Sequence, residues 1–229
     1  MSLILNIDTA LDKASVCLSN EGKVLGLSSS ENQKEHASWL HTAIAELLQK
    51  NEFKINDLQA VAVSIGPGSY TGLRVGLSAA KGLCFALNIP LITVTSLKIL
   101  AYSVKSEAID MICPLIDARR MEVFAAVYDK DLREKISPHA LVVDEKCFAD
   151  ILLKGDVLFC GNGVNNLSAE PSGQPIISNS NARFSNTIAD ASHLAHLSLE
   201  YYNNKEFADL AYAEPLYLKE FFSVPGKTK

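Results

Sequence analysis

The chain has few cysteines, and no spacing among them predicts a structural role. Its five cysteines are scattered, odd in number and free of any CxxC pair, so neither a disulfide framework nor a zinc site is expected. It has no apolar run approaching the roughly 18 residues of a membrane span, and no basic region precedes the short apolar run at its N-terminus. These absences predict a protein of the reducing cytoplasm that is neither exported nor inserted in a membrane.

Basic residues are also in deficit. The chain has 21 Lys and Arg residues against 26 Asp and Glu residues, a formal net charge of -5. A protein that holds nucleic acid unaided needs clustered basic residues to neutralise phosphates, so any RNA that this protein serves is expected to be held by a partner. The 229 residues, 48% hydrophobic and 21% charged, are typical of a globular protein with one large domain or two small ones.

Several catalytic and metal-binding motifs are missing. The glycine-rich segment 66–72 lacks the Gly-Lys-Ser/Thr ending of a P-loop, and Pro67 stands where a Gly-x-Ser-x-Gly elbow around Ser69 would need its first glycine. His36 and His41 are five residues apart, which separates them by about 140° around a helix, so they cannot share a metal as an i, i+4 pair does. We therefore expect neither a catalytic residue nor a metal site.

The expected elements repeat in the same order in the two halves of the chain. The first half has predicted strands at 3–8, 14–19, 23–28, 60–65 and 91–95, a helix at 33–50, and a glycine-rich helix capped by Ser69 or Thr71. The second half has predicted strands at 111–117, 122–128, 139–143 and 157–160, helices at 145–154 and 187–203, and an exposed mobile loop at 165–186. Duplicated β-β-β-α-β-α halves predict the α/β actin-like ATPase fold, with ribonuclease-H-like subdomains at 1–106 and 107–229 that meet at a cleft.

Active proteins of this architecture bind nucleotide phosphates in the turn after the first strand of each half, where an acidic residue and glycine backbone hold metal and phosphate. Here the first turn reads Asp8-Thr9-Ala10-Leu11, with Ala10 where a glycine would let a phosphate approach the main chain. Asp8 therefore either retains a nucleotide role or caps the turn and does no chemistry.

The second half offers a similarly ambiguous set. Asp117 either serves the site or pairs with the neighbouring Arg119 and Arg120, and Gly161-Asn162-Gly163 is either a remnant phosphate loop or a plain turn. Taken with the first turn, these residues predict a degenerate nucleotide site at Asp8, Thr9, Asp117, Gly161 and Gly163.

The glycine-rich helix carries two stripes. The core stripe consists of Leu73, Leu77, Ala80, Cys84 and Leu87. A neighbouring ridge of Gly72, Gly76 and Ala79 is nearly free of side chains. A mid-helix glycine costs roughly 0.5–1 kcal/mol relative to alanine, so the ridge predicts a contact surface that another backbone approaches closely. Before the helix, Pro67 and Gly68 predict a type II turn.

These residues resemble a known family. The segment 65–83, which reads IGPGSYTGLRVGLSAAKGL, is similar to the signature of the TsaB family, the bacterial accessory proteins for making threonylcarbamoyladenosine in transfer RNA. The opening segment 4–10, His36, the segment 114–124 and the closing segment 215–219 also resemble this family. The similarity therefore extends over nearly the whole chain.

The resemblance implies an actin-like fold without the catalytic apparatus of the paralogue TsaD, which transfers threonylcarbamoyl to adenosine 37 of tRNAs that read codons beginning with A. It implies a scaffold that binds and activates a TsaD-like partner, joined by a TsaE-like ATPase, with tRNA bound only through the complex. It also implies that the chain pairs with itself or with the paralogue, with no cofactor of its own and ATP at most at a partner interface. The implied interface consists of His36, Gly72, Leu73, Gly76, Ala79 and Ala80.

Two other functions compete with the scaffold. One is a nucleotide-dependent enzyme of the same fold, an ATPase or a kinase, which the degenerate loops disfavour. The other is a peptidase acting on the paralogue, an activity that has been attached to the family but for which the sequence offers no triad, dyad or metal site. Measuring ATP turnover by the isolated chain separates the scaffold from the nucleotide-dependent enzyme.

Overall fold

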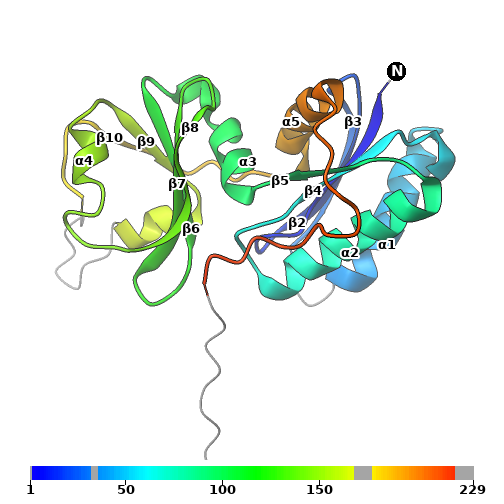
Figure 1. The fold of residues 1–229 in the computed structure, drawn as a ribbon, viewed down its shortest axis with the longest axis horizontal. Coiled ribbons are helices and arrows are strands. Elements are labelled where there is room, and N and C mark those ends of the chain that lie inside the picture. Colours follow the sequence, from blue (N-terminus) through cyan, green and yellow to red (C-terminus); the bar gives the residue numbers. More distant parts are fainter. Residues whose placement is uncertain (1, 32–35, 168–176, 220–229) are drawn as a thin grey trace, which may run out of the picture.

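The chain forms two five-stranded sheets, one from each half of the sequence (Figure 1). The structure is a computed structural model, and it describes residues 2–31, 36–167 and 177–219. Strand order is β3-β2-β1-β4-β5 in the first sheet and β10-β9-β6-β7-β8 in the second. In each sheet the central strand pairs antiparallel with the next strand of the chain and parallel with a later one, so the two sheets share one topology.

The elements of the first half follow the predicted order closely. The strands are β1 (Leu3–Asp8), β2 (Ala14–Asn20), β3 (Lys23–Ser30), β4 (Ala60–Ser64) and β5 (Leu91–Val94). The helices are α1 (His36–Lys50), α2 (Tyr70–Leu87) and α3 (Ser96–Ser103), with short 3-10 turns η2 (Ile55–Asp57) and η3 (Lys105–Glu107). Helix α2 begins where predicted, because the Ser69 side chain accepts a hydrogen bond from the backbone N of Gly72.

The second half repeats this order with shorter helices. Its strands are β6 (Met111–Asp117), β7 (Glu122–Asp129), β8 (Glu134–Val142), β9 (Val157–Cys160) and β10 (Ala182–Ser185). Its helices are α4 (Ala149–Leu152), the 3-10 segment η4 (Asn162–Leu167) and α5 (Ala191–Asn204). The predicted fold class, the actin-like ATPase fold of duplicated halves, is confirmed.

Several local predictions differ from the structure, and the helix predicted at 145–154 spans only α4 (Ala149–Leu152). Helix α3 was not predicted, and β8 begins five residues before the predicted strand at 139–143. The predicted loop at 165–186 contains the end of η4 and all of β10, while residues 168–176 lie outside the described part. The type II turn is also wrong: the Gly66–Pro67 peptide is cis, and the positive φ belongs to Gly66, at 110°, instead of Gly68.

Three core layers hold the sheets and helices together. Helices α1 and α2 pack on one face of the first sheet, and α4 and η4 pack on the outer face of the second. Between the sheets, α3 and α5 join residues of both halves in one apolar core that includes Ile4 and Ile92 of the first sheet and Ile112 and Leu158 of the second. The halves therefore share one hydrophobic layer.

Each half contributes a helix that packs on the inner face of the other half's sheet. Helix α5, from the second half of the sequence, packs on β1 and β2, and α3, from the first half, packs on β6. A buried polar contact fixes α5 in place, because Ser198 Oγ donates to Asn6 Oδ1 at 2.6 Å and Asn6 Nδ2 donates to Ser19 Oγ at 3.0 Å. The division between residues 106 and 107 separates the two sheets, but as a domain boundary it stays a prediction.

Candidate functional site

Asp8 ends β1 inside the protein. Its Oδ1 accepts hydrogen bonds from Ser64 Oγ at 2.6 Å and from the backbone N of Ala10 at 3.1 Å, and the residue is only 6% exposed. Burial raises the pKa of the carboxyl, and the two hydrogen bonds offset this only in part. These contacts are those of a turn cap, with no free carboxylate directed at solvent.

The three glycines at the start of α2 face this turn. A Cβ at Gly68 would lie 2.2 Å from Ala10 O, one at Gly72 would lie 2.1 Å from Thr9 O, and one at Gly76 would lie 2.3 Å from Thr9 Oγ1. Real Cβ atoms do not approach other heavy atoms this closely. The close approach that the glycine ridge predicted therefore exists, but it is made by the chain's own first turn.

Two hydrogen bonds join the same segments. The backbone N of Ser69 donates to Ala10 O at 2.7 Å, and Thr9 Oγ1 donates to Gly72 O at 2.7 Å. Thr9 and Ala10 are both fully buried. One side of the turn after β1 is thus occupied by the glycine-rich segment itself.

This geometry bears on most of the predicted partner interface. Of the six residues, Gly72, Leu73, Gly76 and Ala80 are buried within the chain, and their contact with a partner stays a prediction. Ala79 is 8% exposed and borders a groove on the outer side of α2. The side chain of His36 lies outside the described part of the chain.

The second half's predicted site residues form a hydrogen-bonded turn. The exposed Asp117 accepts, through Oδ1, from the backbone N of Arg119 at 2.8 Å and from Asn166 Nδ2 at 2.9 Å. Asn162 Oδ1 in turn accepts from the backbone N of Asp117 at 3.0 Å. The side chain of Asp117 therefore stabilises the loop between β6 and β7 through these hydrogen bonds.

The glycines after β9 also serve packing. A Cβ at Gly161 would lie 2.3 Å from Leu115 O, and one at Gly163 would lie 2.9 Å from Leu115 Cβ. Gly161 has a φ of 94°, a conformation that glycine adopts without a steric cost. Both residues let η4 lie directly on β6, which favours the plain turn over a phosphate loop.

A cleft of about 530 Å³ lies between the halves. Ser69 and Thr71 line it from the α2 side, and Asp117 and Arg119 line it from the second half. Of the two acidic residues predicted at the nucleotide site, Asp117 borders the cleft, whereas Asp8 is buried behind the turn. The structure therefore does not bring the predicted pair together around one open site.

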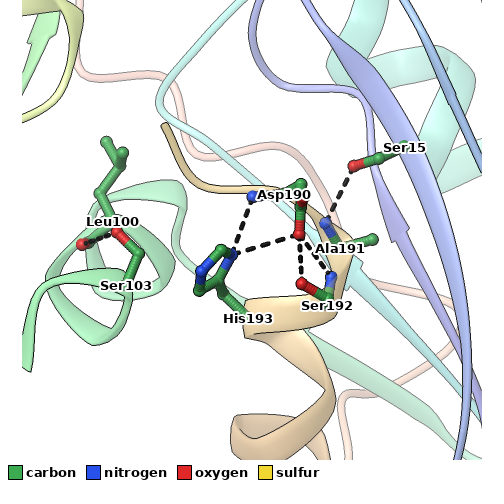
Figure 2. Close-up of polar contacts among 7 residues, drawn as sticks. All are labelled: Ser15, Leu100, Ser103, Asp190, Ala191, Ser192 and His193. Atoms are coloured by element: carbon green, nitrogen blue, oxygen red, sulfur yellow. Dashed lines mark hydrogen bonds and ion pairs between the residues drawn. The ribbon is translucent and has the colours of Figure 1, made fainter. Parts of the chain in front are cut away.

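An Asp–His pair that the sequence did not reveal lies at the start of α5 (Figure 2). Asp190 Oδ1 lies 3.2 Å from His193 Nδ1 and accepts from the backbone N of Ser192 at 2.9 Å. Burial raises the pKa of Asp190, but the hydrogen bonds from His193 and Ser192 outweigh it and lower the pKa to about 2. Ser192 Oγ also donates to the carboxylate, not to the imidazole, so the group caps a helix and does not form a Ser-His-Asp relay.

The outer side of α2 carries an open apolar groove. A groove of about 400 Å³ runs between α1 and α2, lined by His41, Val75, Ala79, Gly82 and Leu83 among others. A Cβ at Gly82 would meet no atom within 4 Å, in contrast to the inward glycines of the same helix. Nearby, the Phe85 side chain is 81% exposed.

Across residues 2–31, 36–167 and 177–219, no three His, Cys, Asp or Glu side chains gather as metal ligands. In that same part of the chain, no helix has both the length and the apolar character that crossing a bilayer requires. All five cysteines are free, and burial raises the pKa of Cys17 and Cys160 to about 12.

Sequence comparison finds a family model and several relatives that match this chain. The family model described as TsaD, tRNA N6-adenosine threonylcarbamoyltransferase, matches residues 23–220. The tRNA threonylcarbamoyladenosine biosynthesis protein TsaB of Bacillus subtilis is 34% identical over 137 residues, which cover 59% of each chain. The Escherichia coli TsaB is 33% identical over 129 residues, or 56% of this chain and 55% of that protein. The alignments therefore span little more than half the length of these curated relatives.

Structural comparison extends the likeness to the whole chain. A Pseudomonas aeruginosa protein described as similar to peptidase YEAZ superimposes with a TM-score of 0.81 at 27% identity, covering 96% of this chain and all of that one. A polyphosphate/ATP-glucomannokinase from Arthrobacter superimposes with a TM-score of 0.52 at 9% identity, covering 89% of this chain, which shows a shared fold alone. The resemblance to TsaB drawn from the sequence is confirmed.

Proposed function

The chain belongs to the TsaD family, with TsaB proteins as its relatives, and from this membership we propose that it takes part in forming N6-threonylcarbamoyladenosine in tRNA. Its role there is that of a non-catalytic scaffold that binds and activates a TsaD-like paralogue. The modified base is adenosine 37 of tRNAs that read codons beginning with A. These finer statements are carried from the TsaB resemblance.

One observation carries the non-catalytic part of the proposal. We expect an actin-like enzyme to hold phosphate at the turn after β1, and here Gly68 and Gly72 pack directly against that turn. Asp8, which ends β1, is buried and accepts hydrogen bonds from Ser64 and Ala10. A phosphate would need backbone N–H groups or cations in that space. The chain's own backbone fills the space on that side of the turn, whereas Ala10, Leu11 and Asp12 line the cleft between the halves.

The outer groove of α2 is the surface we propose for the paralogue. It lies between two long helices, it is apolar, and its floor includes Gly82, whose missing side chain lets a partner helix come close. Phe85 offers an exposed aromatic anchor at its edge. Of the interface residues predicted from the sequence, Ala79 stays within this proposal.

Other partners follow from the same family role. A TsaE-like ATPase joins the complex, ATP binds at most at a partner interface, and the isolated chain pairs with itself when no paralogue is present. The net charge of -5 favours tRNA contact through the complex instead of by this chain alone. We expect the protein to work in the cytoplasm, where tRNA is modified.

The test begins with turnover. The isolated chain should hydrolyse ATP no faster than background, whereas threonylcarbamoyladenosine formation by the TsaD-like paralogue and the TsaE-like ATPase of the same genome should require it. Substantial ATP turnover that Asp8→Ala abolishes would support the competing ATPase or kinase function. Modification that proceeds equally well without the chain would remove the scaffold role.

The interface needs a variant that leaves the fold intact. Gly82→Leu fills open space above α2, so the melting temperature should hold while affinity for the paralogue falls at least about tenfold, because a bulky side chain blocks helix approach. Lys154→Leu, an equally exposed substitution in the second half, is the matched control and should bind normally. Normal binding by both variants places the paralogue elsewhere on the molecule.

A further inference from the structure

The last described residues form a strap that returns to the first half. After α5, residues 205–219 run along the first half toward β6, drawn in orange to red in Figure 1. The backbone N of Ala208 donates to Leu91 O at 2.8 Å, and that of Leu216 donates to Ile65 O at 2.7 Å. The strap is therefore bonded to the first half at both β5 and the end of β4.

Helix α2 supplies the side chains that hold the strap. Lys81 Nζ donates to Ala211 O at 3.2 Å and to Ala213 O at 3.0 Å. About two helical turns before Lys81, Arg74 Nε donates to the hydroxyl of Tyr217 at 3.0 Å. The same helix that borders the proposed partner groove thus carries the strap on another of its faces.

The strap ends by crossing to the second half. Lys219 forms an ion pair with Glu122, donates to Ala118 O at 3.3 Å, and lies 5.9 Å from the ring of Phe124. The side chains of the ion pair are 32% and 29% exposed, so water screens the pair only in part. All three contacts lie in the β6–β7 hairpin, with Ala118 in its loop and Glu122 and Phe124 in β7.

These contacts lie at the cleft. Ala118 and Phe124 line the cleft from the second half, and Tyr70, whose ring lies 5.5 Å from that of Tyr217, lines it from the first. On the opposite side the halves share the apolar core of α3 and α5. An apolar layer joins the halves on one side, and a charged contact joins them on the other. In this arrangement, breaking the charged contact lets the halves pivot about the apolar layer.

We propose that the C-terminal strap is a releasable latch, in which Lys219 holds the β6–β7 hairpin against the α2 side of the first half. Because Arg74 and Lys81 tie the strap to α2, the state of the latch is transmitted to the helix that borders the partner groove. The coupling to the partner rests on the proposed function, whereas the latch itself does not. An ion pair with one charge-assisted hydrogen bond is weak enough to open and strong enough to bias two arrangements.

The distance between the halves tests the latch without any partner. Spin labels at Lys50→Cys and Lys154→Cys, both exposed positions on different halves, report this distance when the half-buried Cys147 is replaced by serine. The other native thiols are buried and unreactive. We expect Lys219→Ala to raise the population with the longer distance between the two labels roughly tenfold. Glu122→Gln, which removes the charge but keeps the shape of the side chain, should have the same effect.

Two controls make the outcome specific. Arg183→Ala removes an ion pair with Asp156 that lies within the second half and is more exposed on its basic side, and it should leave the distances as they are. The exchanged pair Lys219→Glu with Glu122→Lys should restore the shorter distance. Identical distance distributions in Lys219→Ala and the parent, or no recovery in the exchanged pair, would overturn the latch.

A second measurement separates the latch from the proposed function. If the latch opens in Lys219→Ala and the affinity of the chain for the TsaD-like paralogue changes as well, the coupling through α2 holds. If the distances change while affinity stays the same, the latch stands and its coupling to the partner is wrong. If the parent chain does not bind the paralogue at all, the proposed function fails and the distance result remains valid.

Discussion

Asp8 and Asp190 are both drawn away from water, yet their pKa values move in opposite directions. Asp8 has two hydrogen-bond donors against complete burial, and burial prevails. Asp190 is less buried and receives hydrogen bonds from His193 and Ser192 at the start of α5, so its pKa falls to about 2 (Figure 2). The number and charge of the donors, set by the local turn, decide which effect prevails.

Asp8→Asn should stabilise the protein at neutral pH. A folded-state pKa above the unfolded value means that the protonated carboxyl stabilises the fold below about pH 4 and that this contribution is lost as pH rises. The amide oxygen of asparagine can still accept from Ser64 and Ala10, without a buried charge. Urea unfolding from pH 4 to 8 should therefore show the variant gaining on the parent as pH rises. Asp8→Ala removes the oxygen that accepts both hydrogen bonds and should lower the unfolding free energy by about 1–3 kcal/mol. Equal pH profiles for Asp8→Asn and the parent would contradict the argument.

Asp190→Asn should act in the reverse sense. A folded-state pKa near 2 against an unfolded value of about 3.9 makes the ionised carboxylate worth about 2 kcal/mol above pH 4, a contribution lost as pH falls from about 4 to 2. Asparagine still caps α5 but carries no charge. The difference in unfolding free energy between parent and variant should thus be about 2 kcal/mol at pH 6 and close to zero at pH 2. A difference independent of pH would mean that His193 does not favour the ionised form.

Helix α2 shows how one helix presents glycine to two different surroundings. Gly72 and Gly76 face the turn after β1, where backbone and side-chain atoms of Thr9 leave no room for a methyl group, whereas Gly82 faces open space. Six residues separate Gly76 from Gly82, which places them about 120° apart around the helix and so on different faces. The same residue type therefore has a packing role at one position and an open surface at the other.

Single methyl groups should reveal this difference. Gly82→Ala should raise the unfolding free energy by about 0.5–1 kcal/mol, because alanine favours the helix and meets nothing. Gly76→Ala should lower it by roughly 1–3 kcal/mol, since its Cβ would lie 2.3 Å from Thr9 Oγ1. Urea denaturation of both variants and the parent gives the two values. Equal effects would mean that the helix faces have been assigned the wrong way round.

Sequence pattern predicted the strands better than the contacts between distant segments. Strands β1, β6 and β9 match the predicted ranges because each is a short apolar run that ends at a polar or turn residue. Helix α3 was not predicted because its eight residues span only about two helical turns, which is too short for an apolar pattern to repeat. The turn after β1 was predicted to be degenerate from Ala10, but the atoms that fill it come from α2, some sixty residues later, and no local pattern contains that contact.

The same limit governs the candidate interface. Spacing showed that Gly72 and Gly76 need a close neighbour, and the structure supplies that neighbour as Thr9. Periodicity states which residues share a helix face but not what covers the face. Gly82 carried no such signal, since an isolated exposed glycine in a helix is indistinguishable in sequence from a buried one.

Across the whole molecule, the chain is less divisible than its duplicated order suggests. The inner face of the first sheet is covered by α5, whose Leu194 and Leu197 are fully or almost fully buried and belong to the same apolar core as Ile4 and Ile92. Burying one such side chain is worth about 1.5–3 kcal/mol. A cut after residue 106 would remove this helix and the strap together from the sheet that they cover.

Residues 1–106 alone should therefore fail to unfold cooperatively, despite containing the complete first sheet. A chain in which a flexible glycine-serine linker replaces residues 107–186 keeps β1 to β5, α3, α5 and the strap, and it should show dispersed amide resonances and a single denaturation transition. Because both chains lack the second sheet, the difference between them isolates what α5 and the strap contribute. Cooperative folding by residues 1–106 would show that the first half needs no returning helix, and failure of the linked chain would show that the second sheet is itself required to hold α5 in place.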